Sequence, residues 1–325
     1  MSNSALDTIK RTVAPGVHYL SFISGVSRYR TLGTPAARVV MFHGVGGTDC
    51  PVDIFESQMK YLRRNFNVIP LQEALTIAGD AVRNFNSEII LTFDDGLRNN
   101  YTIAYPILLR YELPATFFVC PGLIESRTWQ WAYEMEQRLL GCHLNRLNQI
   151  CEQLGIGEQE RKGNNGSGVV ETIIELMKTM DNDRRIRSEH FIRSLTPDYK
   201  TTKRQHDLYD TMSWDELQSM DPELITIGSH TVHHQLLTRI PSEEIQYQIK
   251  ESKQWLQRRL KRPVDFFCYP NGDYDASIAH VVAQNYKAAV TTKSGYFTKG
   301  DDVYEINRIP AADTLPLFAW RMFRP

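Results

Sequence analysis

The sequence predicts an α/β fold, a distorted (β/α) barrel of about seven parallel strands that carries a helical insertion. Short apolar segments recur along the chain, most of them are continuous rather than alternating, and helical patterns separate many of them. Continuous apolar strands are typical of parallel sheets that are covered on both faces. With 325 residues and 42% hydrophobic content, the chain can bury a core of this size.

The strand candidates are short runs rich in β-branched and aromatic side chains. They lie at Arg38–Phe42, Asn67–Leu71, Glu88–Phe93, Ala115–Cys120, Leu224–Gly228, Val264–Cys268 and Ala288–Thr292, with a weaker eighth at Tyr304–Ile309. Helical patterns at Ile54–Asn65, Tyr101–Tyr111 and Ser242–Arg262 fall between them. This alternation of strands and helices predicts the βα units of a barrel.

One interval breaks the alternation. Between Cys120 and Leu224, roughly a hundred residues contain only helical patterns, judged by the spacing of apolar side chains. We therefore expect an N-terminal extension at residues 1–36 and a barrel at 37–325, with a helical insertion at about 125–222. Loops on a barrel rim shape substrate sites, so we expect the insertion to do so here.

Composition excludes several classes of function. The formal net charge is −1, which provides no global field to recruit nucleic acid or an anionic membrane. Five cysteines, an odd number without a Cys-x-x-Cys pair, argue against a disulfide framework or a structural zinc ribbon.

Two apolar segments bear on membranes, although no run approaches the length of a transmembrane helix. Val17–Val26 follows basic residues as in a weak signal peptide, but polar side chains interrupt it and no small-residue cleavage site follows. We therefore expect a cytoplasmic protein. The final segment, Leu315–Phe323 with Arg321 and Arg324, is a candidate for peripheral membrane contact, and packing against the barrel is the alternative that we favour.

Two motifs contain most of the candidate catalytic and metal-binding residues. IILTFDDG at Ile89–Gly96 is an apolar run that ends in two carboxylates, and SHTVHH at Ser229–His234 follows another apolar run. One aspartate and two histidines can hold a divalent ion with positions open for water and substrate. The second carboxylate of the pair stays free to accept a proton, so the motifs predict metal-assisted hydrolysis.

The polar candidates share one position, the C-terminal ends of the predicted strands. In parallel α/β folds the active site forms at that edge. An Asp-Asp-Gly after a strand is more often a turn when it stands alone, and a strand-end histidine is often structural. The residues placed at this edge are His43, Asp94, Asp95, His230, Tyr269-Pro270-Asn271-Gly272 and Arg308.

These motifs resemble the polysaccharide deacetylase (NodB-homology) family, carbohydrate esterase family four. The resemblance rests on TFDDG (Thr92–Gly96), HTVHH (His230–His234) and YPNG (Tyr269–Gly272), and covers roughly Arg38–Ala311 apart from the insertion. It implies a distorted barrel of about seven strands.

The resemblance also implies roles for single residues. Asp95, His230 and His234 would be the metal ligands, while His233 is only their neighbour. Asp94 would be the general base, and the backbone N–H of Asn271, after Tyr269 and Pro270, would stabilise the oxyanion. Zinc is the expected ion for such ligands, and cobalt or nickel suits the same set.

The chain departs from the family pattern in two places. Cys268 stands where many members have an arginine that orients the base, and the tail Ile306–Asp313 lacks the usual Leu-x-His with its acidic histidine. Both departures resemble the branch that acts on exopolysaccharides or surface glycans. There, a histidine near the first strand can supply the acid, which points to His43. Arg308 is a candidate replacement charge beside Asp94.

The sequence therefore predicts a metal-dependent N-deacetylase for an amino sugar of a surface polysaccharide, or for its lipid- or nucleotide-linked precursor. Two alternatives stay open. One is a small-molecule amidase that cleaves a formamide or ureide, and a closed, charged cavity would favour it. The other is a non-catalytic glycan-binding protein, consistent with the departures at Cys268 and in the tail.

Overall fold

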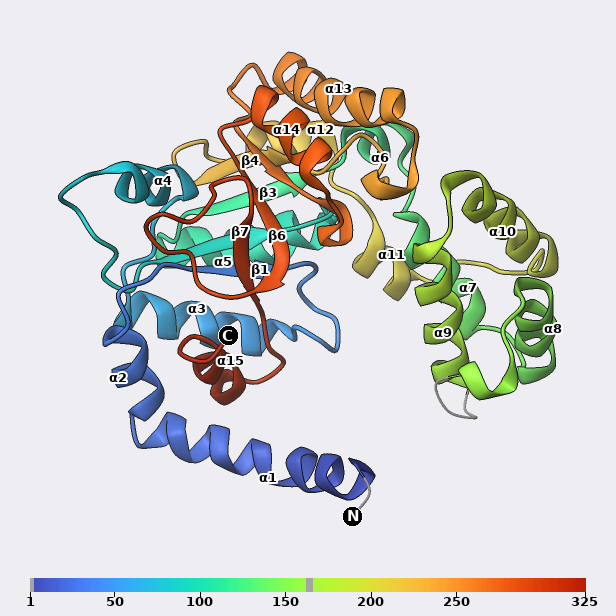
Figure 1. Ribbon diagram of the computed structural model, residues 1–325, viewed down its shortest axis with the longest axis horizontal. Coiled ribbons are helices and arrows are strands. Elements are labelled where there is room, and N and C mark those ends of the chain that lie inside the picture. The colour runs from blue at the N-terminus through green and yellow to red at the C-terminus, as the bar shows by residue number, and fades with distance from the viewer. Residues whose placement is uncertain (1–2, 162–165) are drawn as a thin grey trace.

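Seven parallel strands close into a barrel in the chain order β1 to β7, and β7 pairs with β1 (Figure 1). The computed structural model describes residues 3–161 and 166–325. The predicted fold class is confirmed. The strands are β1 Arg38–Phe42, β2 Ile89–Phe93, β3 Ala115–Val119, β4 Ile225–Ser229, β5 Phe266–Cys268, β6 Ala288–Ser294 and β7 Ile306–Pro310.

One strand candidate is wrong. Within Asn67–Leu71 only Val68 forms a bridge, with Ile89, and helix α4 (Leu71–Gly79) begins immediately afterwards. Pro70 explains the change, because it lacks an N–H for a sheet ladder and its φ of −66° suits the entry to a helix. The weaker candidate at Tyr304–Ile309 instead supplies the seventh strand, β7.

Helices cover the outside of the barrel (Figure 1). In α3, the side chains of Phe55, Met59 and Leu62 recur at helical spacing and are buried against the strands. Inside, the ring of Phe42 stacks on that of Phe93 with centroids 5.0 Å apart. The covering helices are α3 Val52–Asn65, α4, the π-helix Asn100–Ala104, α5 Tyr105–Tyr111, α13 Ser242–Leu260, α14 Ala276–Asn285 and α15 Leu315–Arg321.

Between β3 and β4 the chain forms a helical lobe beside the barrel (Figure 1). The lobe has its own apolar cluster, which includes Met135, Leu139, Ile150 and Ile173. Its helices are α7 Trp131–Leu140, α8 Leu144–Leu154, the 3-10 turn Glu158–Glu160, α9 Gly166–Thr179, α10 Asn182–Leu195 and α11 Lys203–Tyr209. The two helices at the ends of this interval, α6 Pro121–Ser126 and α12 Trp214–Ser219, pack against the barrel and α13 instead. Two further 3-10 turns, Leu237–Arg239 and Pro270–Gly272, lie in later loops.

The N-terminal helices α1 (Asn3–Ile23) and α2 (Val26–Leu32) lie beside α15 at the base of the barrel (Figure 1). The fully buried Arg38 joins these parts, because its guanidinium donates to the backbone oxygens of Thr31 and Met322. Across the described ranges, no helix combines the length and apolarity that crossing a bilayer requires.

Candidate active site

The turn after β2 presents two neighbouring carboxylates in different directions. The backbone N–H of Asp94 continues the strand pairing by donating to the Phe42 oxygen at 2.9 Å. Asp95 and Gly96 then take positive φ values of 70° and 68°. A Cβ at Gly96 would come within 3.0 Å of the Val119 side chain, so only glycine fits this turn. Left-handed backbone at an aspartate is strained and occurs preferentially at functional sites.

Asp95, His230 and His234 converge on one small volume. The Asp95 Oδ1 atom lies 3.5 Å from Nε2 of His230 and 3.3 Å from Nε2 of His234, and all three side chains are buried. Oδ1 has no hydrogen-bond partner among the described residues. A buried carboxylate oxygen without a partner beside two ring nitrogens is a set of donors that fits a divalent ion.

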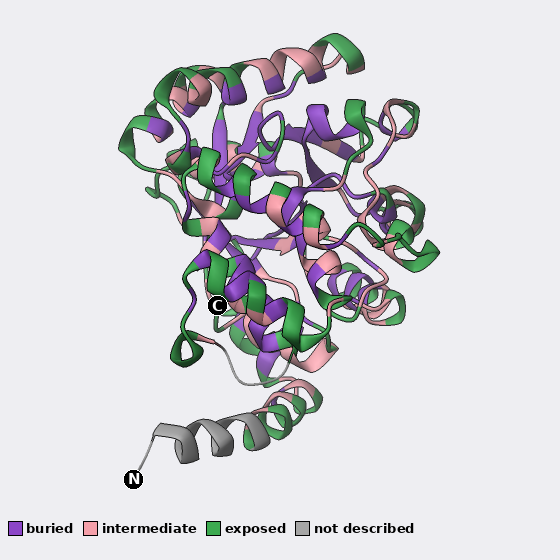
Figure 2. Ribbon diagram, turned by 90° about the vertical axis from the view of Figure 1, so that its right-hand side faces the viewer, coloured by how far each residue is buried: buried purple, intermediate pink, exposed green. Residues whose placement is uncertain are grey.

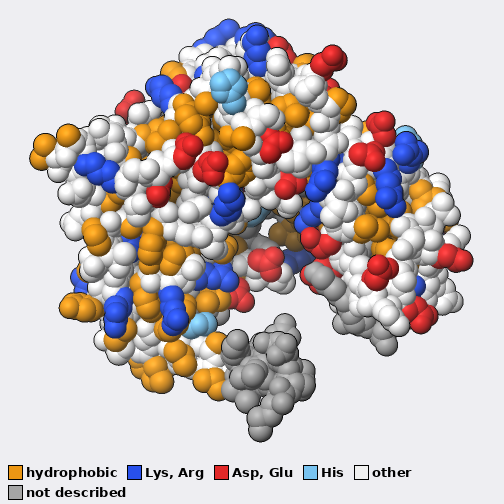
Figure 3. Space-filling view, in the orientation of Figure 1, with side chains coloured by type: hydrophobic (Ala, Val, Ile, Leu, Met, Phe, Trp, Pro, Cys, Tyr) orange, Lys and Arg blue, Asp and Glu red, His pale blue; other side chains and the backbone are white. Residues whose placement is uncertain are grey.

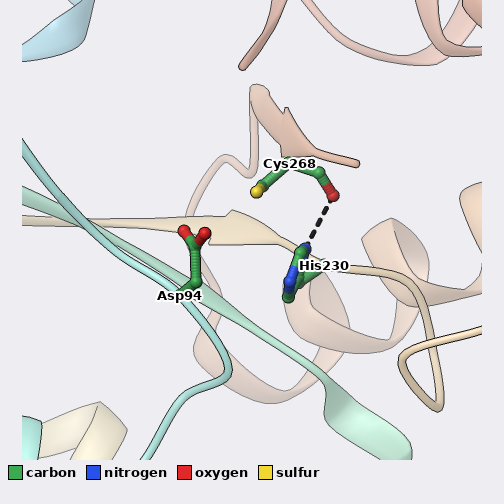
Figure 4. Close-up of side chains that lie close together, drawn as sticks. All are labelled: Asp94, His230 and Cys268. Atoms are coloured by element: carbon green, nitrogen blue, oxygen red, sulfur yellow. Dashed lines mark hydrogen bonds between the residues drawn. The ribbon is translucent and has the colours of Figure 1, made fainter. Parts of the chain in front are cut away.

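Groups outside the trio orient these three side chains. The ring of His230 bonds through Nδ1 to the Cys268 carbonyl at 2.7 Å (Figure 4), which leaves Nε2 facing Asp95. A hydrogen bond of this kind fixes the ring and the tautomer of a metal-binding histidine. Asp94, His230 and Cys268 also lie close together (Figure 4), but both Asp94 oxygens are already bonded to Arg308.

The helical lobe supplies two further partners that the sequence did not reveal. The Tyr133 hydroxyl donates to Asp95 Oδ2 at 2.5 Å, and Nε2 of Gln130 contacts Nδ1 of His234 at 3.0 Å. Since an amide nitrogen only donates, ligation through Nε2 of His234 would require this amide to turn its oxygen toward Nδ1. At present that oxygen caps α7 by accepting from Ala132 and Tyr133. In the sequence, the only local sign of these two contacts is the glutamine directly before the Trp-Ala-Tyr with which the helix starts.

Replacing Tyr133 by Phe should weaken metal binding without unfolding the barrel. Burial, reinforced by the Asp95 carboxylate, raises the pKa of Tyr133 well above its usual value, so its hydroxyl stays a donor. Losing that donor should lower the affinity for zinc by roughly 10- to 100-fold in a chelator competition. Tyr209→Phe is the matched control, because its ring packs against Tyr133 while its hydroxyl accepts from Gln137. Equal affinity in both variants would contradict the role given to Tyr133.

Asp94 and Arg308 form a buried, bidentate ion pair. The guanidinium NH1 lies 2.8 Å from Oδ1 of Asp94, and NH2 lies 2.7 Å from Oδ2. NH2 also donates to the Cys268 Sγ atom at 3.2 Å. Burial alone would raise the pKa of Asp94, but the charge and hydrogen bonds of Arg308 outweigh it and hold the pKa below its usual value. Arg308 on β7 therefore lies beside the small Cys268 and keeps Asp94 ionised.

His43 lies at the mouth of the site. It follows β1, is exposed, and lines a cavity of about 610 Å³ together with Tyr133, Arg204 and Tyr209. Figure 3 shows a hollow between the barrel and the helical lobe. Its role as an acid stays a prediction.

The loop after β5 places its two candidates differently. Asn271 is exposed with a φ of 57° in the 3-10 turn Pro270–Gly272. The Tyr269 side chain is buried, and its hydroxyl donates to the Tyr304 oxygen at 3.1 Å. Neither Tyr269 nor Asn271 lines the cavity beside His43, and the oxyanion role given to this loop stays a prediction.

The family model for polysaccharide deacetylase matches residues 83–148 and 184–289, together more than half of the chain. The chain belongs to the polysaccharide deacetylase family. The matched ranges contain Asp94, Asp95, His230, His234 and Asn271, whereas His43 and Arg308 lie outside them. Between the two matched ranges, the described residues 149–161 and 166–183 belong to the helical lobe.

Relatives of this polysaccharide deacetylase-family chain are distant. It is 19% identical over 276 residues to YxkH of Bacillus subtilis, itself named for this family, covering 83% of this chain and 70% of YxkH. Deacetylase PplD of Streptococcus pyogenes, solved with acetate, is 18% identical with a TM-score of 0.59, covering 90% of this chain and all of PplD. IcaB of Ammonifex degensii is 16% identical with a TM-score of 0.58, covering 89% and 98%. These two structures share the fold.

Proposed function

We propose that this protein is a metal-dependent carbohydrate N-deacetylase, a hydrolase that removes the acetyl group from an N-acetylated amino sugar. The observation that carries the proposal is the buried trio of Asp95, His230 and His234, with an unpaired carboxylate oxygen facing both rings. The neighbouring Asp94 stays ionised, which makes two carboxylates available for two different tasks.

The residues divide the chemistry between them. A divalent ion held by the trio, with zinc the expected one and cobalt or nickel suited to the same ligands, would acidify a water molecule and polarise the amide carbonyl. Asp94 accepts the proton of the attacking water, and Arg308 fixes the direction of its carboxylate. His43 protonates the leaving amine, and the Asn271 N–H stabilises the oxyanion. Both the orientation and the ionised state of the Asp94 carboxylate therefore depend on the buried Arg308.

The substrate that we propose is an amino sugar within a surface polysaccharide, or its lipid- or nucleotide-linked precursor. The cavity beside the site opens at residues that are exposed, such as His43, Thr48 and Arg204, rather than closing around a small molecule. The rings of Tyr133 and Tyr209, 5.0 Å apart, provide an apolar wall on which a sugar face can pack. A cytoplasmic location, which we expect, would favour the precursor.

The first test combines metal analysis with acetate release. Purified protein should contain close to one metal ion per chain, and it should release acetate from at least one member of a panel of N-acetylated sugars. His230→Ala should lose both the metal and the activity, because a buried ligand is removed. His280→Ala, an exposed histidine on α14, is the matched control and should lose neither.

The outcomes separate the alternatives. Metal without acetate from any sugar would favour the small-molecule amidase, or the glycan-binding protein if sugars bind without reacting. Protein that stays free of metal when zinc, cobalt or nickel is supplied would contradict the mechanism.

A further inference from the structure

One side of helix α1 is attached firmly to the barrel. The ring of His18 packs against that of Trp320 on α15 with centroids 4.9 Å apart, and Phe22 packs against Tyr61 on α3 at 5.7 Å. A hydrogen bond between the Ser21 and Ser27 hydroxyls, 2.9 Å long and buried, joins α1 to α2. These contacts fix the orientation of α1, with the side that carries His18, Ser21 and Phe22 facing the barrel.

The opposite side of these helices is apolar and exposed. Val13, Val17, Leu20 and Ile23 follow one another at helical spacing, and Leu20 and Ile23 are 62% and 59% exposed. Figure 2 shows exposed positions along the described part of the helix at its lower edge, and more than half of the large exposed apolar side chains in the described ranges belong to this surface. We call it the α1–α2 face: Val13, Val17, Tyr19, Leu20, Ile23, Val26, Tyr29 and Leu32.

The charged side chains that α2 itself exposes are both arginines. The sequence contains no Asp or Glu between Asp7 and Asp49. Arg28 and Arg30 are exposed within α2, and Arg324, which follows α15, lies over the Trp320 ring. Since the whole chain has a net charge of −1, this positive charge is a local feature of the base of the barrel.

We propose that the α1–α2 face binds the surface of an anionic phospholipid bilayer, with α1 lying in the plane of the membrane. An exposed apolar helix face flanked by arginines suits the boundary between acyl chains and anionic headgroups. Docking of the inner side on α15 leaves only the outer side for lipid, which favours an in-plane arrangement. The proposal is independent of the deacetylase activity.

Sedimentation of the full-length protein with vesicles tests this proposal. Protein should bind vesicles of equal parts phosphatidylcholine and phosphatidylglycerol, and bind phosphatidylcholine alone at least roughly tenfold more weakly. Leu20→Ser with Ile23→Ser should abolish binding to both. Arg28→Glu with Arg30→Glu should remove the preference for the anionic lipid. Circular dichroism and thermal unfolding check that each variant is folded.

Matched controls change the same chemistry elsewhere. Val82→Ser with Leu144→Ser removes two exposed apolar side chains outside the face, and Arg184→Glu with Arg187→Glu reverses two exposed charges on α10. Both controls should bind like the wild type. Failure of the wild type to bind anionic vesicles would overturn the proposal, as would unchanged binding by the Leu20/Ile23 variant. A dimer that this variant converts to monomers, without vesicle binding by the wild type, would assign the face to a second copy.

Discussion

Asp94→Asn should lower kcat for acetate release by roughly 10²- to 10⁴-fold, because an amide cannot accept the proton of the attacking water. Metal content should stay at the wild-type level, since Asp94 is not one of the three proposed ligands, Asp95, His230 and His234. The measurement is initial-rate kinetics on the substrate found in the sugar panel, with metal analysis of the same preparation. Asp215→Asn, an exposed position in the first turn of α12, is the control for the chemical change.

A loss of activity through unfolding has to be separated from a loss of the base. In Asp94→Asn, the fully buried guanidinium of Arg308 loses its counter-charge. Combining Asp94→Asn with Arg308→Met removes both charges and should restore part of the stability without restoring activity. Wild-type turnover in a folded Asp94→Asn protein would show that another group is the base.

Arg308→Met should destabilise the protein by about 3–5 kcal/mol at neutral pH, because it leaves the Asp94 carboxylate buried without its partner. Arg308 also donates to the Thr291 oxygen at 2.6 Å and to the Thr92 hydroxyl at 3.1 Å, so the substitution leaves further acceptors without a donor. Urea unfolding measures the change. The surface pair Arg63–Glu112 is a control, and Arg63→Met there should cost less than about 1 kcal/mol.

The loss should depend on pH with a defined sign. In the wild type, the lowered pKa of Asp94 contributes stability above the unfolded-state value of about 3.9, and this contribution disappears as pH falls through the lower folded value. In Arg308→Met, burial is the largest influence that remains and raises the pKa of Asp94, so the buried carboxylate becomes destabilising as pH rises above the unfolded value. The difference between the two proteins should therefore shrink toward acidic pH. A pH-independent difference would mean that Arg308 contributes only through packing.

Sequence alone was sufficient for the barrel and for naming Asp95, His230 and His234, the three side chains that the structure brings together. Each of β1, β2 and β4 is a short apolar run whose own residues specify a buried strand, and the polar residue after it must then appear at the strand's C-terminal end. The two carboxylates and the His-Thr-x-x-His spacing are local features as well. Pro70 shows the limit, because an apolar run of the right composition entered a helix instead.

The sequence already offered Arg308 as a candidate charge beside Asp94, but only the tertiary structure decided the actual contacts around Asp94 and around the trio. Arg308 reaches Asp94 from β7, with β1 between β7 and β2 in the barrel, and 214 positions separate the two residues. Gln130 and Tyr133 approach the trio because the lobe folds back over the barrel rim. No periodicity or spacing encodes such contacts, since they depend on how the barrel closes and where the lobe packs. The sequence by itself therefore determined which side chains meet at the rim, whereas closure of the barrel and the packing of the lobe decided which groups orient them.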